Sequence, residues 1–292
     1  MIGRVLRATR RIPAVAVACI TVFAFDAVLL SPGNGTATAV ANGPTLAVFG
    51  GGGMSLVDSP GHSAIIAIRQ DPDRASDAII ASNEHLNVGA GCKYLWQTDL
   101  SPYNDTAPGY DLWVRCANVT GQWVLFMLEG ADQVSVSHPT RTTNLTNGKN
   151  IQILAGTDND TITILDGTAE VWGEAGNDVI RGGPKDDVFH GGPGFDELTT
   201  GLGKGPDRDE MYGDEGNDTL VGGRDRDILD GGSGLDILAA RGARDTLNAR
   251  DGEADEINCG GDSAVADILR FDPGVDKLFH CAAEKRRNPS GT

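Results

Sequence analysis

A nine-residue period in the second half of the chain constrains its fold more than any other feature. Large apolar residues recur nine positions apart in two runs of five. The first run is Ile162, Val171, Ile180, Phe189 and Leu198, and the second is Met211, Leu220, Leu229, Leu238 and Leu247. An aspartate stands two residues before nine of these ten positions, and Ala169 takes its place once. The pattern indicates an internal structural repeat.

Each repeat joins a glycine-rich turn to a short strand. The most complete turns read Gly-Gly-Pro-Gly-Phe-Asp at 191–196 and Gly-Gly-Ser-Gly-Leu-Asp at 231–236. Glycine permits the positive φ angles that such turns need. One strand buries only one apolar side chain, so the repeats must stack into a solenoid in which neighbours complete the core. A disordered glycine-rich tract is the alternative, but it does not explain a phase held from residue 162 to residue 247.

Residues 155–247 resemble the hemolysin-type, or repeats-in-toxin (RTX), calcium-binding nonapeptides Gly-Gly-x-Gly-x-Asp-x-U-x, in which U is a large aliphatic residue. The resemblance implies a parallel β-roll in which two nonapeptides make one coil and Ca²⁺ lies between successive turns of the same side. It also implies that calcium is bound as the protein folds. Carboxylate and carbonyl oxygens are the hard ligands that calcium prefers. The rest of the chain is less specifically similar to secreted actinobacterial proteins of this class.

The turns alternate between two sides of the expected roll. Leu198 and Met211 are 13 residues apart, which predicts one turn lengthened by four residues and an alternation that continues beyond it. One side, which we call the acidic side, has nine acids and no Lys or Arg in turns 155–160, 173–178, 191–196, 213–218 and 231–236. The other, the mixed side, has turns 164–169, 182–187, 200–209, 222–227 and 240–245. These contain eight acids and seven bases, namely Lys185, Lys204, Arg208, Arg224, Arg226, Arg241 and Arg244.

This charge difference predicts where calcium binds. Carboxylates without neighbouring cations need a metal ion to offset their repulsion, whereas carboxylates facing arginine can pair internally. We therefore expect up to four sites in the four gaps of the acidic side and few, weaker sites opposite; the alternative is that the bases project into solvent and both sides bind equally. The predicted ligand residues are Asp160, Gly173, Gly176, Asp178, Gly191, Gly192, Gly194, Asp196, Gly213, Gly216, Asp218, Gly231, Gly232, Gly234 and Asp236, and, more weakly, Asp187, Asp209, Asp227 and Asp245.

The first 41 residues are typical of a secretory signal peptide. Four arginines precede an apolar stretch from Ile12 to Leu30, and Ala39-Val40-Ala41 offers a small-x-small cleavage site. A membrane anchor is the alternative, but Asp26 interrupts the apolar run. Cleavage would remove four of 24 bases and one of 41 acids, leaving 20 bases, 40 acids and a net charge of −20. We expect a secreted, extracellular protein with no remaining transmembrane segment and no nucleic-acid partner.

Cysteine usage agrees with export. Without Cys19, the remaining cysteines are Cys92, Cys116, Cys259 and Cys281. Four cysteines allow three connectivities, and the wide gap between the two local pairs favours Cys92 with Cys116 and Cys259 with Cys281. Zinc is the alternative, but neither pair has the two-residue spacing of a zinc site. The second disulfide would staple the end of the solenoid, where an unpaired strand edge favours aggregation.

These features predict an all-β protein in which a small β-rich domain precedes a parallel β-roll solenoid of nonapeptide repeats. The expected divisions are a signal peptide at 1–41, the β-rich N-terminal domain at 42–150, the calcium-binding β-roll at 151–250 and a disulfide-stapled C-terminal cap and tail at 251–292. Apolar segments such as Leu46–Phe49, Ala64–Ile68 and Trp123–Leu128 indicate strands in the N-terminal domain. Asp255–Cys259 and Asp276–Leu278 keep a loosened form of the repeat.

No catalytic motif is recognisable. The chain has no H-E-x-x-H or G-x-S-x-G sequence, and its five histidines do not cluster. We therefore expect no enzyme but a secreted calcium-binding protein with a structural or interaction role, whose folding is coupled to Ca²⁺. The alternatives are a cell-surface adhesin that binds a protein or polysaccharide, and an extracellular hydrolase or lyase with an unrecognised site in residues 42–150.

Overall fold

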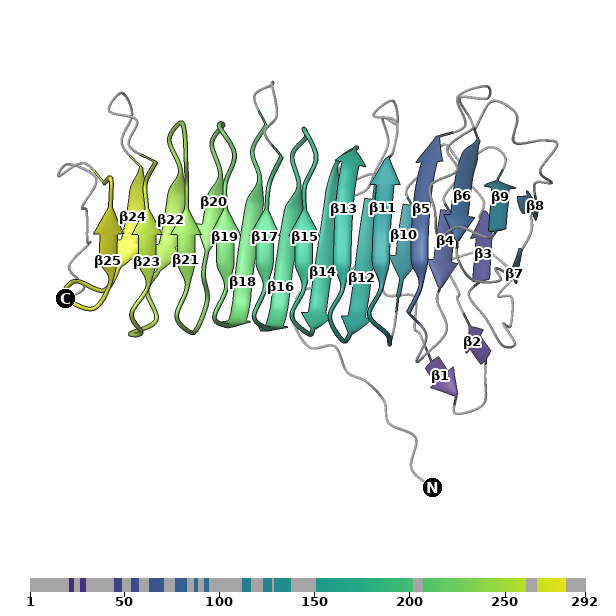
Figure 1. Ribbon diagram of the computed structural model, residues 1–292, viewed down its shortest axis with the longest axis horizontal. Coiled ribbons are helices and arrows are strands. Elements are labelled where there is room, and N and C mark those ends of the chain that lie inside the picture. Colours follow the sequence, from purple (N-terminus) through teal and green to yellow (C-terminus); the bar gives the residue numbers. More distant parts are fainter. Residues whose placement is uncertain are drawn as a thin grey trace.

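Two β-sheets run along the molecule and form the facing walls of a solenoid (Figure 1). The computed structural model describes residues 21–23, 27–29, 45–48, 54–57, 63–70, 77–82, 87–88, 92–94, 112–116, 123–127, 129–137, 151–201, 207–260 and 267–281. Within these residues one sheet has 11 strands and the other 12, and β1 (Thr21–Phe23) and β2 (Ala27–Leu29) form a separate antiparallel pair. No helix of the described chain is long and apolar enough to cross a membrane.

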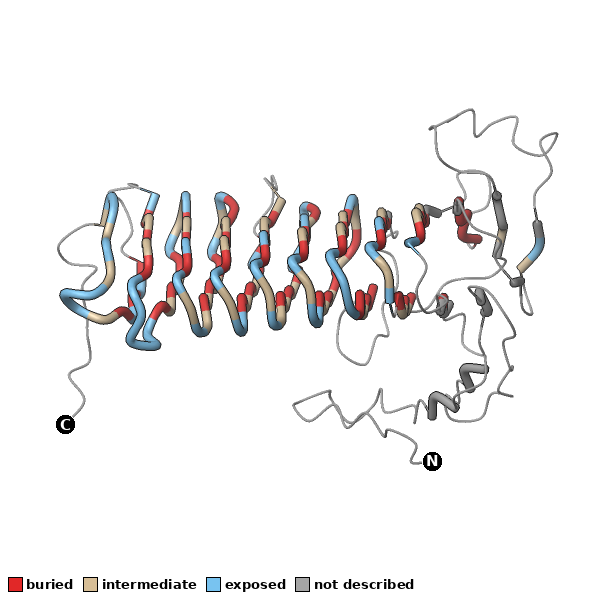
Figure 2. The backbone as a smooth tube through the Cα atoms, turned by 60° about the horizontal axis from the view of Figure 1, so that its bottom comes forward, coloured by how far each residue is buried: buried red, intermediate tan, exposed pale blue. Residues whose placement is uncertain are grey.

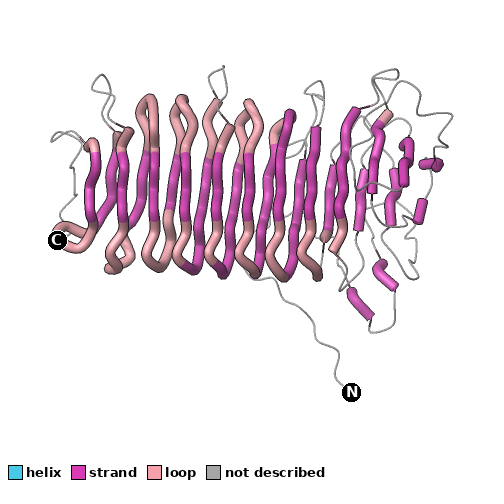
Figure 3. Tube along the Cα trace, viewed as in Figure 1, coloured by secondary structure: helices cyan, strands magenta, loops and turns pink. Residues whose placement is uncertain are grey.

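Each coil of the solenoid contributes one strand to each sheet. β14 (Ala169–Ala175) pairs in parallel with β16 (Val188–Gly194) in the first sheet, and β15 (Val179–Arg181) pairs in parallel with β17 (Glu197–Thr199) in the second. The register joins residues two nonapeptides apart, such as Ile162 and Ile180, so two nonapeptides make one coil. Figure 3 shows the resulting alternation of short strands and loops. The predicted parallel β-roll is confirmed.

The other strands of the roll follow the same order. In the first sheet they are β12 (Ile151–Thr157), β18 (Glu210–Gly216), β20 (Ile228–Asp230), β22 (Thr246–Ala249) and β24 (Ile268–Phe271). In the second sheet they are β13 (Thr161–Asp166), β19 (Thr219–Val221), β21 (Ile237–Ala239), β23 (Glu256–Asn258) and β25 (Lys277–Phe279).

The lengthened turn leaves the alternation intact. Val188 pairs with Glu210 in the first sheet, and Glu197 pairs with Thr219 in the second, so both registers jump by 22 residues instead of 18. The extra residues therefore lie in turn 200–209, and the strands on either side of it keep their sheets. Lys204 lies outside the described residues, as does the predicted signal peptide apart from the backbone of β1 and β2.

The core is a single column of side chains between the two sheets. All ten periodic apolar residues, from Ile162 to Leu247, are completely buried. Figure 2 shows that buried residues recur in every coil of the stack. Each side chain packs against its equivalents in the neighbouring coils, so the core grows by repetition, as the period predicts.

The stack of coils extends beyond the periodic sequence at both ends. Upstream, β10 (Trp123–Phe126) pairs in parallel with β12, and β11 (Gln133–Ser137) pairs in parallel with β13. β4 (Met54–Val57) pairs in parallel with β10, and β5 (Ile65–Gln70) pairs in parallel with β11. Downstream, β23, β24 and β25 continue both sheets, so the loosened repeat after Leu247 still makes coils.

Antiparallel strands close the N-terminal end of both sheets. In the first sheet β3 (Thr45–Val48) pairs antiparallel with β4, and the short edge strand β7 (Asn87–Val88) pairs in parallel with β3. In the second, β6 (Ala78–Ser82), β9 (Leu112–Cys116) and β8 (Cys92–Tyr94) follow β5. The buried Ile66 and Ile80 belong to the same hydrophobic cluster as the roll. The predicted β-rich N-terminal region is thus built onto the end of the solenoid.

A disulfide closes the C-terminal end. Cys259 and Cys281 are bonded, with their Cα atoms 5.0 Å apart, and they join the residue after β23 to the segment after β25. This pairing agrees with the sequence prediction, and it fastens the last strand of the second sheet. At the other end, the antiparallel register places the backbone of Cys116 opposite Cys92, as the predicted Cys92–Cys116 pair requires.

Candidate metal centre

A row of buried aspartates follows each side of the roll. We call them ladder aspartates, because each lies at the end of a turn, next to the equivalent aspartate of the neighbouring coil. On the acidic side the row is Asp132, Asp160, Asp178, Asp196, Asp218, Asp236, Asp255 and Asp276. On the mixed side it is Asp187, Asp209, Asp227, Asp245 and Asp267. All nine aspartates predicted from the repeat belong to these rows, and each is at most 3% exposed.

One hydrogen bond is repeated along both rows. Except for the last of each row, the main-chain N–H of a ladder aspartate donates to Oδ1 of the ladder aspartate in the following coil. The N–H of Asp178 donates to Asp196 over 2.7 Å, and the N–H of Asp196 donates to Asp218 over 2.8 Å. On the mixed side, Asp187 N–H donates to Asp209 over 2.7 Å. A hydrogen bond from a main-chain N–H to a charged carboxylate oxygen stabilises the buried carboxylate, and it also fixes the register between coils.

The second carboxylate oxygen separates most of the acidic side from turns 182–187 and 222–227 of the mixed side. Oδ2 is buried and makes no hydrogen bond within the described part of the chain in at least six ladder aspartates of the acidic side: Asp160, Asp178, Asp196, Asp218, Asp236 and Asp255. Asp245 of the mixed side also has a buried Oδ2. A buried carboxylate oxygen without a donor carries a large desolvation cost. A cation beside these oxygens would remove that cost.

In four turns of the acidic side, the glycine that opens the turn makes room for this oxygen. A Cβ atom on Gly191 would collide with Oδ2 of Asp196 and would lie 2.8 Å from the carbonyl oxygen of Gly213 in the next coil. A Cβ atom on Gly173 would likewise collide with Oδ2 of Asp178 and lie 2.5 Å from the Gly191 carbonyl oxygen. The carboxylate oxygen and the carbonyl oxygen of the next coil therefore converge on the same space.

The remaining predicted glycines bring carbonyl groups of adjacent turns together. Gly213 repeats the arrangement of Gly191 around Asp218, and Gly231 has Oδ2 of Asp236 where its Cβ would lie. Gly176, Gly194, Gly216 and Gly234 each have the main-chain carbonyl of the preceding coil where a Cβ would lie, and so do Gly192 and Gly232. Among the described residues, no group of three His, Cys, Asp or Glu side chains is placed to hold a metal without other ligands. Carboxylate Oδ2 and turn carbonyls together supply the hard oxygen ligands that suit Ca²⁺.

The turns of the acidic side share a left-handed residue at their second position. Gly192 and Gly232 have φ of 107° and 99°, and Glu174 and Asp214 adopt φ of 69° and 74° at the same position. A side chain in this conformation is strained, which is why glycine is favoured there. Retention of a left-handed Glu and Asp shows that the stacking of the turns determines this conformation.

Burial perturbs the ionisation of the acidic row. Desolvation is the main cause that raises the pKa of Asp160, Asp196, Asp218 and Asp255 to about 7 and that of Asp178 to about 6. Neighbouring ladder carboxylates add repulsion, as Asp196 and Asp236 do for Asp218. The main-chain bond to Oδ1 opposes these effects but does not cancel them. Without a cation, the acidic side therefore holds its carboxylates in an environment that disfavours their charge.

Two turns of the mixed side satisfy Oδ2 internally. Gly183 N–H donates to Oδ2 of Asp187 over 3.1 Å, and Gly223 N–H donates to Oδ2 of Asp227 over 2.7 Å. In these turns both carboxylate oxygens accept main-chain bonds, so the need for a cation is smaller. Turn 240–245 differs, because Arg241 and Ala243 adopt left-handed φ of 69° and 66°.

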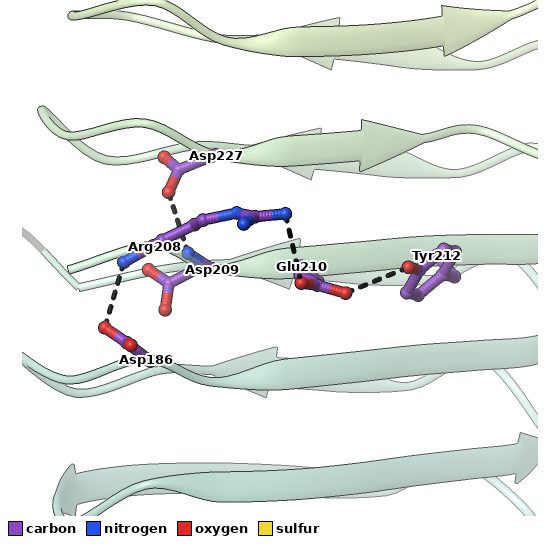
Figure 4. Close-up of polar contacts among 6 residues, drawn as sticks. All are labelled: Asp186, Arg208, Asp209, Glu210, Tyr212 and Asp227. Atoms are coloured by element: carbon purple, nitrogen blue, oxygen red, sulfur yellow. Dashed lines mark hydrogen bonds and ion pairs between the residues drawn. The ribbon is translucent and has the colours of Figure 1, made fainter.

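The bases of the mixed side do not act as the sequence suggested. Arg208 forms its ion pair with Glu210 on β18, at 3.4 Å, and not with a ladder aspartate (Figure 4). Lys185, Arg224, Arg226, Arg241 and Arg244 are exposed. Within the described chain, Asp209 and Asp227 have no ion pair with any of these bases. The expectation of internal pairing with arginine is therefore wrong at these two positions, and at Asp227 the main-chain amide of Gly223 takes that role.

The acidic row is longer than the predicted ligand set. Asp132, Asp255 and Asp276 continue it, and Asp255 has the same unpartnered Oδ2 as the predicted members. Turn 250–255 lacks the two opening glycines, so it does not fit the repeat, although Asp255 keeps its place before the buried Ile257. An aspartate two residues before a buried apolar residue is the signal that would have identified it.

Comparison with known proteins agrees with this geometry. Residues 166–204, 205–238 and 212–247 match the RTX calcium-binding nonapeptide repeat. Searches of curated proteins and of solved structures gave no match. The matched segments contain ladder aspartates of both sides, from Asp178 to Asp245. The repeat region is therefore an RTX β-roll that binds Ca²⁺.

The raised pKa values predict how the calcium-free protein responds to pH. The folded-state pKa of Asp160, Asp196 and Asp218 lies near 7, against 3.8 for an ordinary aspartate. Between about pH 4 and pH 7 the folded state therefore binds more protons than the unfolded state, so its stability decreases as pH rises. In chelator, the midpoint of thermal unfolding should fall as pH rises through this window. With saturating Ca²⁺ the fall should be abolished, because the ion replaces the protons. A calcium-free midpoint that rises with pH over the same range would contradict this assignment.

Asp196 and Asp187 form a matched pair for testing the two sides. Each accepts a main-chain bond of 2.7 Å at Oδ1, but Oδ2 is unpartnered in Asp196 and bonded to Gly183 in Asp187. Asp196→Ala should remove one or two calcium ions from the stoichiometry measured by isothermal titration calorimetry, whereas Asp187→Ala should leave it unchanged. Equal losses would show that the two sides bind calcium alike.

Proposed function

We propose that this chain is exported and that its RTX β-roll folds around calcium ions to serve a structural or interaction role outside the cell. The observation that carries the proposal is the row of six buried Oδ2 atoms on the acidic side. Calcium in the gaps between these turns would neutralise the ladder and join each coil to the next.

The energetics favour coupling between calcium and folding. The unfolded chain has no preformed site, so the free energy of calcium binding adds to the free energy of folding. At a free calcium concentration about 100-fold above the dissociation constant, each independent site would add about 2.7 kcal/mol. Several sites in a row would make the roll stable in calcium and marginal without it.

Sequence features of export support the proposal that the protein binds calcium outside the cell. Residues 1–41 have the arginines, apolar stretch and small-residue site of a signal peptide. The Cys259–Cys281 disulfide suits an oxidising compartment. Extracellular modules bind calcium with dissociation constants of about 10⁻⁴ to 10⁻³ M, so a roll of this affinity would fill on leaving the cell.

We further propose that the protein acts without catalysis. In the roll, the buried titratable groups with raised pKa values are aspartates of the turns, where metal binding accounts for them. In an interaction role, a protein or polysaccharide partner would bind to the exposed faces of the solenoid and its N-terminal strands.

A calcium titration of the purified protein tests the proposal. Circular dichroism should report a gain of β-structure as calcium is added, and chelator should reverse it and lower the midpoint of thermal unfolding. Magnesium at the same concentration serves as the control, because its preference for near-octahedral sites makes it a poor substitute. If chelator leaves both the β signal and the midpoint unchanged, the coupling of folding to calcium is refuted.

A further inference from the structure

The exposed large apolar residues of the described chain are unevenly distributed over the roll. Seven such residues are between 42% and 62% exposed. Only Ile268 belongs to the first sheet. The other six lie on the second sheet or directly before one of its ladder aspartates, and they are Leu165, Phe195, Leu235, Ile237, Val275 and Phe279. Exposed apolar residues that share one face of a soluble protein indicate a contact surface.

The strands β15, β17, β19, β21, β23 and β25 follow one another in the second sheet and present this face (Figure 1). The middle residue of each strand points into the core, so its first and third residues point outward. The residue before each buried ladder aspartate also points outward. The parallel register aligns these positions from coil to coil. We call this surface of β15 to β25 and the turn residues before them the second-sheet face.

The charges on the strands of the second-sheet face are balanced. Their outward residues include two bases and two acids, and these pair within the molecule. Arg181 lies 3.3 Å from Glu197, and Lys277 lies 3.0 Å from Glu256. The whole chain, by contrast, has a formal net charge of −17 at pH 7. A second copy of so acidic a chain meets less repulsion at a face whose charges are balanced.

The order of these charges determines how two such faces can meet. From β15 to β25 the strands carry a base, an acid, no charge, no charge, an acid and a base. Two copies with their strands in the same order would oppose like charges, and so would copies reversed about a point between β19 and β21. Reversal about β21 itself places Glu197 opposite Lys277 of the second copy, and Lys277 opposite its Glu197. Opposite charges across an interface fix its register.

The apolar residues agree with the same register. β21 would face its own equivalent, so Leu235 and Ile237 would each meet the same residue of the second copy. β17 would face β25, which brings Phe195 against Val275. Such a contact is self-complementary, as a two-fold interface requires. Two sheets packed face to face lie about 10 Å apart, a distance that these side chains fill.

We propose that the second-sheet face docks against the same face of a second copy of this chain, about a two-fold axis that runs parallel to the strands through β21. The proposal rests on the interaction role proposed above and names its partner as a second roll. Phe195, Leu235 and Val275 each precede a ladder aspartate, so calcium that orders the turns of the acidic side also orders this apolar row. Bound calcium also lowers the net negative charge of both copies, which reduces their repulsion.

Sedimentation velocity of the purified protein in calcium, over a series of protein concentrations, tests whether dimers form. An equilibrium between monomer and dimer is expected, with circular dichroism showing in the same buffer that the roll is folded. A folded protein that stays monomeric at every concentration, or that forms open-ended oligomers, would overturn the docking. If chelator leaves the fold unchanged, the coupling of folding to calcium is refuted, whereas dimers of that folded protein would still support the docking surface.

Charge reversal tests the register. Glu197→Lys and Lys277→Glu should each weaken dimerisation by about tenfold or more, because each places like charges opposite one another. The double variant should restore dimerisation. Both ion pairs within the molecule stay broken in the double variant, so they cannot account for the rescue. A double variant that dimerises more weakly than either single variant would overturn the register.

Ile237 and Ile268 supply a matched pair of apolar variants. They are 46% and 45% exposed, and each is the first residue of its strand, but Ile237 lies on the proposed axis and Ile268 lies on the first sheet. Ile237→Ser should weaken dimerisation, because it removes the contact from both copies at once. Ile268→Ser should dimerise as the parent protein does. Equal dimerisation of the two variants would contradict docking through the second-sheet face.

Discussion

The hydrogen bond between a ladder aspartate and the main-chain amide of the coil before it is the interaction on which the structure depends. It buries a carboxylate in nine of the ten half-coils of the repeat and fixes the register in which the apolar core forms. It also leaves one carboxylate oxygen to be satisfied by something else. On the acidic side, for example at Asp178 and Asp218, no described group of the protein supplies that partner. The residue that organises the stack therefore also creates its need for a cation.

The two sides of the roll place different groups beside Oδ2 of the ladder aspartate. At Asp187 and Asp227 the second glycine of the turn donates its N–H to Oδ2, so the turn closes on its own aspartate. On the acidic side the second residue is left-handed, as at Gly192 and Asp214, and Oδ2 faces the carbonyl groups of the next coil instead. The difference between the sides thus lies in turn conformation as much as in charge. One solenoid therefore has a row of similar unpartnered carboxylate oxygens on one side and a more varied set of turns on the other.

Much of this architecture could be predicted from the sequence because the repeat is local. All ten residues that the nine-residue period picks out, from Ile162 to Leu247, are buried, and the interval of 13 located the lengthened turn. The coil at turn 250–255 was not assigned to the ligand set because its opening glycines are replaced, although stacking retains Asp255 in the row. The coil formed by β10 and β11 has no periodic sequence, and its parallel pairing depends on contacts with the roll.

Other features depend on three-dimensional contacts that a linear pattern does not encode. Turns 182–187 and 191–196 both begin with Gly-Gly-Pro, yet Gly183 donates to Asp187 whereas Gly192 adopts a left-handed φ. The outward direction of Arg208 and Arg226 likewise follows from the path of the turn. Charge counts therefore gave the wrong physical reason for part of the difference between the two sides.

The most direct test of the central claim is a crystal structure of the protein grown in calcium, with the ions located by anomalous scattering. The account predicts a row of peaks on the acidic side, each within about 2.3 to 2.6 Å of Oδ2 of a ladder aspartate and of turn carbonyl oxygens. Peaks beside Asp178, Asp196 and Asp218 would establish that the unpartnered oxygens are calcium ligands. A calcium-saturated structure with no peak beside these atoms would contradict the account.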